Sequence, residues 1–289
     1  MESVMTNAQQ LRKHMIEAVK PHLDKPIAFS GGVDSASILA AMLANDVKPE
    51  LFTFMIPGVH SEDYEATRRI VKQYALTLHT VELPADKTQI VSDAIEVMQL
   101  IDTMKFPRSK AKVYVQCASP FLHLGKAAAA NNVTTMLFAM AAGDLYATSR
   151  NYSKTVSKYG EEYTREKRRE AICESTIESD FMCQAAARKY GLETIDIYKT
   201  PCVRDFLLSL DLAEMNKPKP KQIAKDAFPE FFDTFYRVPS SLQIAGGLRD
   251  YYAGVLIPEM NVDDANRRMA KLYRQLDTAS DTLFETGQS

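Results

Sequence analysis

Cysteine is scarce in this sequence, and its spacing does not suit a metal site. The 289 residues include four cysteines, none of them spaced as C-x-x-C, so neither a structural zinc site nor an iron–sulfur cluster is indicated. Free thiols and the absence of an apolar leader in residues 1–20 favour a reducing cytosol, and we expect a cytoplasmic protein. No window approaches the roughly 20 continuous apolar residues of a membrane span, so we expect no membrane partner.

The sequence also lacks an excess of charge and the usual phosphate-binding motif. A formal net charge of −2 argues against a protein that binds nucleic acid by general electrostatics. The basic residues within 165–169 keep a nucleic-acid partner open. Gly-Lys-Ser and Gly-Lys-Thr, which mark the phosphate loop of ordinary nucleotide hydrolases, are both missing.

The chain does contain a short bend where a strand, predicted over residues 26–29, runs into an apolar helix over residues 36–43. The bend consists of Ser30, Gly31, Gly32, Val33, Asp34 and Ser35. Its glycines let backbone N–H groups approach an anion, and the serine hydroxyls and the helix start add further donors. A carboxylate beside phosphates requires a cation, so Asp34 predicts Mg²⁺. A plain capped turn is the competing interpretation.

Strands and helices alternate along the rest of the chain. Further strands are predicted over residues 51–56, 78–83, 134–139 and 193–198, with helices between them. Ser61 is the predicted cap of the helix that follows it, and Asp86 with Gln89 predicts a capping box for a helix that runs to residue 98. This order predicts an α/β fold: a parallel five-stranded sheet with helices on both faces, followed by a mainly helical C-terminal part. We expect an N-terminal helix in residues 1–25, the main domain in 26–260, and a helix and frayed tail in 261–289. The charged residues 154–170 are either a solvated segment or a basic lid.

The bend resembles the S-G-G-x-D-S signature of the PP-loop ATP pyrophosphatases, which cleave ATP between its α and β phosphates and leave an adenylated intermediate. The order of the later elements, over residues 28–252, is similar to the synthetase domain of asparagine synthetase and its β-lactam synthetase relatives. The resemblance implies an adenine nucleotide alpha hydrolase-like fold, with ATP and Mg²⁺ as cofactors.

The resemblance also implies particular site residues. Residues 137–146 align with the family's L-S-G-E-G-x-D-E-L-F block, where Asp144 is the only acid left. We expect Asp144 to join Asp34 as a Mg²⁺ ligand; the alternative is an acid that caps a helix beginning at Leu145. Lys221 matches the lysine of the family's E-K-x-x-L-R segment, and we expect it to stabilise the transition state of adenylation.

Two further segments concern the pyrophosphate and the acceptor. Gly246 and Gly247 resemble the segment that closes over pyrophosphate, with a plain loop between helices as the alternative. Residues 193–206 align with the family's E-x-R-x-P-F-x-D stretch, but Ile195 replaces the arginine and Thr200 the aspartate. Aspartate is therefore not the expected acceptor, since its charged groups need charged partners.

These features predict an AMP-forming carbon–nitrogen ligase that adenylates a small-molecule carboxylate and transfers ammonia or another amine to it. The chain begins Met1-Glu2 where full asparagine synthetases carry an N-terminal catalytic cysteine, so we expect no glutaminase domain. A separate glutaminase partner and a homodimer remain open. Two alternatives remain: a PP-loop enzyme that acts on a nucleobase or nucleotide, as in the tRNA, deazapurine and NAD synthetase branches, and an inactive binding protein of the same fold.

Overall fold

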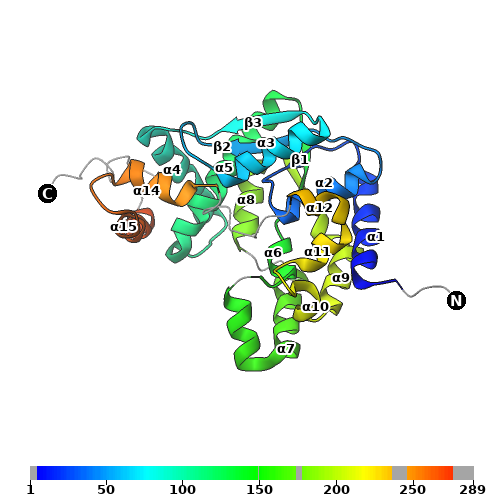
Figure 1. Ribbon diagram of the computed structural model, residues 1–289. Helices are drawn as coiled ribbons and strands as arrows, with labels where there is room; N and C mark the ends of the chain where they lie inside the picture. The colour runs from blue at the N-terminus through cyan, green and yellow to red at the C-terminus, as the bar shows by residue number, and fades with distance from the viewer. Residues whose placement is uncertain (1–4, 149, 174–177, 236–245, 276–289) are drawn as a thin grey trace.

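The computed structural model describes residues 5–148, 150–173, 178–235 and 246–275. Its centre is a parallel sheet of five strands in the order β3-β2-β1-β4-β5 (Figure 1). The strands are β1 (Ile27–Ala28), β2 (Leu51–Met55), β3 (Leu78–Glu82), β4 (Thr135–Phe138) and β5 (Glu193–Asp196). The predicted fold class is confirmed.

The strand order reverses beside β1. Ile27 pairs with Leu51 of β2 on one side and with Leu137 of β4 on the other. The chain therefore builds β1, β2 and β3 outward in one direction and then returns to add β4 and β5. In open parallel sheets this reversal creates a crevice beyond the carboxyl ends of the strands, where ligands bind. The predicted bend follows β1, so it lies at this point.

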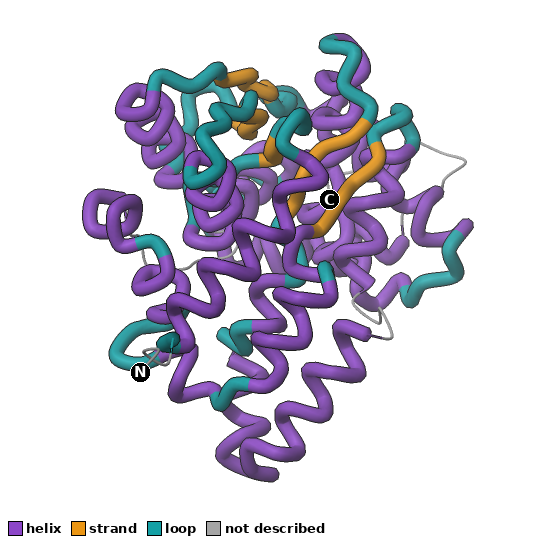
Figure 2. The backbone as a smooth tube through the Cα atoms, turned by 90° about the vertical axis from the view of Figure 1, so that its right-hand side faces the viewer, coloured by secondary structure: helices purple, strands orange, loops and turns teal. Residues whose placement is uncertain are grey.

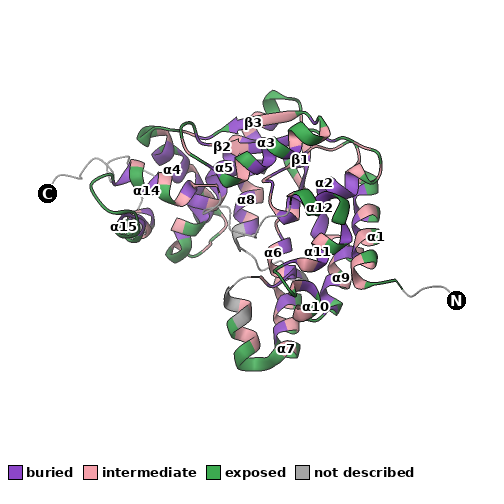
Figure 3. Ribbon diagram, viewed as in Figure 1, coloured by how far each residue is buried: buried purple, intermediate pink, exposed green. Residues whose placement is uncertain are grey.

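Helices cover both faces of the sheet, as predicted (Figure 2). Buried side chains alternate along the strands: Leu51 and Leu137 join one core, while Phe52, Met136 and Phe138 join the other. Buried residues concentrate in the interior of the protein and exposed ones at its periphery (Figure 3). The first core is covered by α1 (Asn7–Val19), α2 (Val33–Leu43), α3 (Glu62–Tyr74), α9 (Pro201–Ser209), α11 (Gln222–Ala227) and α12 (Pro229–Phe235). The second is covered by α4 (Lys87–Thr103), α5 (Ala111–Ala130), α8 (Glu178–Arg188), α14 (Leu248–Leu256) and α15 (Val262–Gln275).

Shorter elements connect these helices and strands. They are η1 (Lys20–His22), η2 (Arg108–Lys110), α6 (Ala142–Leu145), η3 (Ile197–Lys199) and α10 (Leu212–Asn216). Two helix starts follow their sequence signals. Ser61 caps α3 by accepting a bond from the Tyr64 N–H at 3.2 Å, and Asp86 caps α4 through the Gln89 N–H at 2.9 Å. The predicted capping box at α4 is wrong in its second half, because the Gln89 side chain donates to Asp93 instead.

The charged segment 154–170 belongs to a helix, α7 (Arg150–Cys173), which bends at Gly160 and projects from the body (Figure 1). Most of its surface is solvated, which agrees with the first of the two alternatives predicted for this segment. Arg168 is an exception and is buried, with 1 % exposure. The predicted tail at residues 286–289 lies outside the described residues. The division of the chain at residues 25 and 260 remains a prediction.

Candidate active site

The bend after β1 is held in a shape that only glycine adopts comfortably. Gly31 has a φ of +70°, and a Cβ at this position would lie 2.9 Å from the Thr67 backbone nitrogen and 3.0 Å from the Ala66 Cβ. A side chain there would have an unfavourable backbone conformation and would also overlap with Ala66 and Thr67 of α3. The bend can thus lie close against α3.

Hydroxyl groups fix the interior of the bend. The Ser30 N–H donates to the Ser35 Oγ at 3.2 Å, the two serine hydroxyls lie 3.2 Å apart, and the Gly32 N–H donates to the Ser30 Oγ at 3.3 Å. Gly32 is the N-cap of α2 and offers no side-chain cap, while Val33 begins the helix with its side chain buried. The first N–H groups of α2 therefore have no capping side chain and are available to an anion.

Lys221 joins this bend from a distant part of the chain. Its Nζ lies 2.7 Å from Oδ1 and 2.6 Å from Oδ2 of Asp34, 187 residues away in sequence. The Lys221 side chain is 5 % exposed and that of Asp34 is 25 % exposed. The ammonium also lies 5.6 Å from the centroid of the Tyr146 ring. The structure thus brings together the two residues predicted to be catalytic.

The backbone around Lys221 is fixed by a residue that the sequence patterns did not indicate. Lys221 is the N-cap of α11 and has a left-handed conformation with φ of +59°, which is strained for a residue with a side chain. Its N–H donates to the Asn216 Oδ1 at 2.8 Å, and the Asn216 Nδ2 donates to the Tyr146 carbonyl at 2.8 Å. Asn216 is therefore a positioning residue for the lysine. Nothing in its local sequence distinguishes it from an ordinary helix-terminal asparagine.

Asp144 lies in the first turn of α6, beyond the end of β4. The helix begins at Ala142, so the alternative in which Asp144 caps a helix starting at Leu145 is wrong. Burial raises the pKa of the Asp144 carboxyl, while a hydrogen bond from Tyr152 and the charges of Lys199 and Lys221 act in the opposite direction. Asp144 therefore lies near Lys221, in a setting that disfavours its charged form unless a cation is close.

The two acids match the donor set of Mg²⁺, which typically binds one or two carboxylates and completes its shell with phosphate oxygens and water. Among the described residues no group of three or more histidine, cysteine or acidic side chains is placed to hold a metal. A site made by Asp34 and Asp144 alone would need the oxygens of a bound phosphate. Their assignment as metal ligands remains a prediction.

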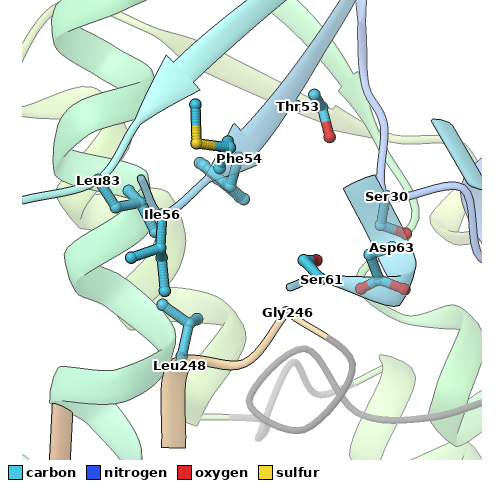
Figure 4. A pocket seen from close by; sticks show the side chains of 10 residues that line it. Ser30, Thr53, Phe54, Ile56, Ser61, Asp63, Leu83, Gly246 and Leu248 are labelled. Carbon is cyan, nitrogen blue, oxygen red and sulfur yellow. The ribbon is translucent and has the colours of Figure 1, made fainter. Parts of the chain in front are cut away.

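A pocket opens on the β2 side of the bend (Figure 4). It is a shallow, open pocket: the space between its lining residues is about 320 Å³ only when the open solvent at its entrance is included. Ser30, Ser61 and Asp63 lie toward one side, and Ile56, Leu83 and Leu248 form an apolar wall. The full lining is Ser30, Thr53, Phe54, Met55, Ile56, Ser61, Asp63, Leu83, Gly246 and Leu248. The sequence patterns did not indicate this pocket, because its walls come from five separate segments of the chain.

The two predicted glycines lie at the mouth of this pocket. Gly246 lines it, and Gly247 has a φ of +75° and is the N-cap of α14. A Cβ at Gly247 would lie 3.2 Å from the Val59 Cγ1. Gly246 thus lines the same pocket as Ser30, and the backbone of Gly247 packs closely against Val59. Their predicted contact with pyrophosphate remains a prediction.

The basic run on α7 is engaged with other parts of the protein. Arg165 pairs with Asp211, Lys167 with Glu170, and Arg169 with Glu166. Arg168 donates from Nη2 to the carbonyl oxygens of Leu145 and Leu207, so it ties α7 to α6 and α9. Such intramolecular pairs weaken the interpretation of this run as a free phosphate-binding surface.

The parallel sheet, the strand reversal and the glycine–serine bend define a nucleotide-binding protein of the PP-loop ATP pyrophosphatase class. The family model described as asparagine synthase matches residues 10–222, which are 213 of the 289 residues. The chain belongs to the asparagine synthase family. The match contains the bend, Asp144 and Lys221, and it indicates an ATP-dependent synthetase. A comparison with curated proteins gives no match. Within the described residues no helix is long and apolar enough to cross a membrane.

Proposed function

We propose that the protein is an AMP-forming carbon–nitrogen ligase. It adenylates a carboxylate with ATP, releases pyrophosphate, and lets ammonia or another amine displace AMP to form an amide. The observation that carries this proposal is the contact between Lys221 and Asp34 at the strand reversal. The contact places a buried cation against a carboxylate of the bend, next to the start of α2, whose first N–H groups have no capping side chain. Phosphoryl chemistry needs such a set of charges and N–H donors.

The pocket on the β2 side suits the nucleoside. Its apolar wall of Ile56, Leu83 and Leu248 would accept the adenine ring, and its polar side leads to Ser30. The β and γ phosphates would then lie on the N–H groups of the bend and the start of α2. The α phosphate would remain within reach of Lys221.

In this arrangement the chain acts mainly by positioning and by neutralising charge. Lys221 shifts from Asp34 toward the α phosphate and stabilises the negative charge that develops as the carboxylate attacks. Asp34 and Asp144 would hold Mg²⁺, which when bound neutralises the pyrophosphate leaving group. Removal of the Lys221 ammonium should slow adenylation by a factor on the order of 10² to 10³.

Residues 193–206 align with the segment that binds the acceptor in the family, but Ile195 and Thr200 stand where the family has charged residues. Ile195 packs against the first core, and the Thr200 hydroxyl donates to the Ile197 carbonyl at 2.6 Å. Neither residue supplies the charged partner that an α-amino or α-carboxyl group needs. We therefore propose a carboxylate other than aspartate.

The alternatives have less support. A nucleic-acid acceptor would rely on the basic run of α7, whose side chains pair with acids or lie buried. An inactive binding protein would have no use for the strained Lys221 backbone or for an anion-binding bend.

The test is exchange of labelled pyrophosphate into ATP in the presence of a panel of small carboxylates. We expect exchange that depends on one class of acid and on Mg²⁺, and that falls on the order of 10²-fold or more in Lys221→Met. Lys225→Met, on the same helix α11 but paired at the surface with Asp233, is the matched control and should keep its rate. No exchange with any acid in the panel would refute the proposal.

A further inference from the structure

Asp180, on α8, is a buried carboxylate with an oxygen that no part of the described chain satisfies. The residue is 8 % exposed, and its Oδ2 has no hydrogen-bond partner among the described residues. Burial raises the pKa of this carboxyl to about 7. Buried acceptors without a donor are costly and rare, and they often mark a place where a ligand binds.

The groups around Asp180 are charged and come from three other elements. The charge of Lys199 on η3 lowers the pKa of Asp180, while those of Asp196 on β5 and Asp144 on α6 raise it. On its own helix the neighbour is Cys183, a fully buried thiol whose pKa burial also raises, with Cys117 of α5 beside it. Asp180 is in the first turn of α8, which packs on β5 and leads into its start, so the first turn of α8 lies beyond the carboxyl end of β5. Three acids and one lysine therefore gather beyond the carboxyl ends of β4 and β5.

Asp180 differs from the other two acids because their oxygens have donors. Asp196 accepts from the Ala141 N–H at 2.8 Å and from the Tyr198 N–H at 3.0 Å. Asp144 accepts from the Tyr152 hydroxyl. Only the Oδ2 of Asp180 is left as a buried acceptor in this group, within the part of the chain that the structure describes.

The acids lie on the opposite side of β1 from the nucleoside pocket. The strand order places β2 on one side of β1 and β4 with β5 on the other. Tyr198, whose N–H donates to Asp196, also donates from its hydroxyl to the Asp34 carbonyl at 3.3 Å, so this group adjoins the bend. For Asp180 to act, the carboxylate activated beside Lys221 must lie on this side of the bend.

We propose that Asp180 is the residue that binds the nitrogen nucleophile, and that its Oδ2 accepts an N–H of ammonia or of a small primary amine. This inference rests on the proposed ligase function. The nitrogen lone pair forms the C–N bond to the acyl carbon of the adenylate. The bond from that carbon to the phosphate oxygen breaks, and AMP leaves with the electron pair. The proton that the nitrogen loses passes to the Asp180 carboxylate and then to water.

The test separates adenylation from transfer of nitrogen in Asp180→Asn, which keeps the size of the side chain but takes up no proton. Adenylation is measured as pyrophosphate exchange with the carboxylate panel. Transfer is measured as AMP release that depends on ammonium chloride. Hydroxylamine, a stronger nucleophile and weaker base than ammonia, is the second probe. Asp233→Asn, the same change at a surface residue of α12 that pairs with Lys225, is the control.

We expect Asp180→Asn to retain exchange within about threefold and to lose ammonium-dependent AMP release by about 10² to 10⁴-fold. Hydroxylamine should recover most of the transfer rate, and the control should behave as the wild type. Ammonium-dependent release at the wild-type rate would overturn the inference and leave the ligase function intact. Equal loss of exchange and transfer would also overturn it, since Asp180 would then serve adenylation or folding. Absence of exchange in the wild type would refute the ligase function and this inference with it.

Discussion

Gly31 occupies the most crowded backbone position of the phosphate-binding bend. Its positive φ and its approach to α3 leave no space for a methyl group. A second glycine, Gly58, has a similar φ of +76° but nothing within 4 Å of the position of a Cβ. A comparison of substitutions at the two glycines therefore separates the effect of backbone conformation from that of steric crowding.

Gly31→Ala should destabilise the protein more than Gly58→Ala, by roughly 1–3 kcal/mol, because both introduce an unfavourable φ but only the first forces atoms to overlap. Urea unfolding of both variants measures the difference. Gly31→Ala should also lose ATP binding, and Gly58→Ala should keep it. Equal stability of the two variants would show that the bend has room for a side chain.

The raised pKa of Asp180 makes stability depend on pH. Its folded-state pKa of about 7 lies above its ordinary value of 3.8, so the folded protein binds this proton more tightly than the unfolded chain. The stabilisation of the folded state by this bound proton is fully present below pH 3.8 and is lost as the pH rises through 7. At pH 8 the buried charge destabilises the fold, by up to about 4 kcal/mol for a shift of this size.

Asp180→Asn should therefore be more stable than the wild type at pH 8. The difference in the free energy of unfolding between the two proteins should shrink toward pH 5. Asp196, whose pKa burial raises to about 6, acts in the same direction. Because its charge also raises the pKa of Asp180, the two acids are coupled, and the pH dependence that is lost in Asp180→Asn includes this coupling. Urea unfolding at the two pH values provides the measurement. A gap that does not change with pH would mean that Asp180 titrates normally.

Single residues also show what the sequence could reveal of the site. The Ser30 to Ser35 bend was predictable because all of its groups are contiguous and its chemistry is local. The role of Lys221 was predicted from the resemblance to the family. Its contact with Asp34 joins residues 187 positions apart, and no local pattern specifies that contact. Asn216 and Asp180 were missed, because their roles arise only when separate elements pack together.

At the scale of elements, α5 and α8 pack closely on the second face of the sheet. The contact depends on Gly125 of α5, where a Cβ would lie 2.8 Å from the Ala187 carbonyl oxygen of α8 and 3.0 Å from the Tyr190 Cβ. Gly254, in α14, has nothing within 4 Å of its Cβ position.

Two alanine substitutions within helices should have opposite effects. Gly254→Ala should stabilise the protein by up to about 1 kcal/mol, because alanine loses less conformational entropy in a helix. Gly125→Ala gains the same propensity but should lose roughly 1–3 kcal/mol to overlap with α8. Thermal unfolding of both variants tests this. If Gly125→Ala proved as stable as Gly254→Ala, the two helices would not be in close contact.

The helices and strands were largely predictable from the sequence. The errors in their predicted bounds and burial have physical causes. Alternating apolar runs gave the five strands, and Ser61 marked the start of α3. The helix α4 extends to Thr103, beyond the predicted residue 98, since no glycine or proline stops it there. The burial of Arg168 could not be predicted, because it depends on carbonyl groups of α6 and α9 rather than on the charged sequence around it.

At the scale of the whole molecule, the strand reversal beside β1 divides the site into two sides. The nucleoside pocket lies toward β2, the acids Asp144, Asp180 and Asp196 lie toward β4 and β5, and the bend with Lys221 lies between them. In the proposed reaction, this division would place the nucleotide and the acceptor on either side of the phosphate that joins them. The strand order therefore determines the layout of the proposed reaction.

The account depends most on the claim that the bend and Asp34 bind the phosphates of ATP together with Mg²⁺. Calorimetric titration with Mg-ATP tests it most directly, using the wild type, Asp34→Asn and, as control, Asp46→Asn beyond the other end of α2, where asparagine tolerates the φ of +58°. We predict that the wild type and the control bind ATP equally and that Asp34→Asn binds at least about tenfold more weakly. No binding to the wild type, or equal binding to all three, would contradict the account.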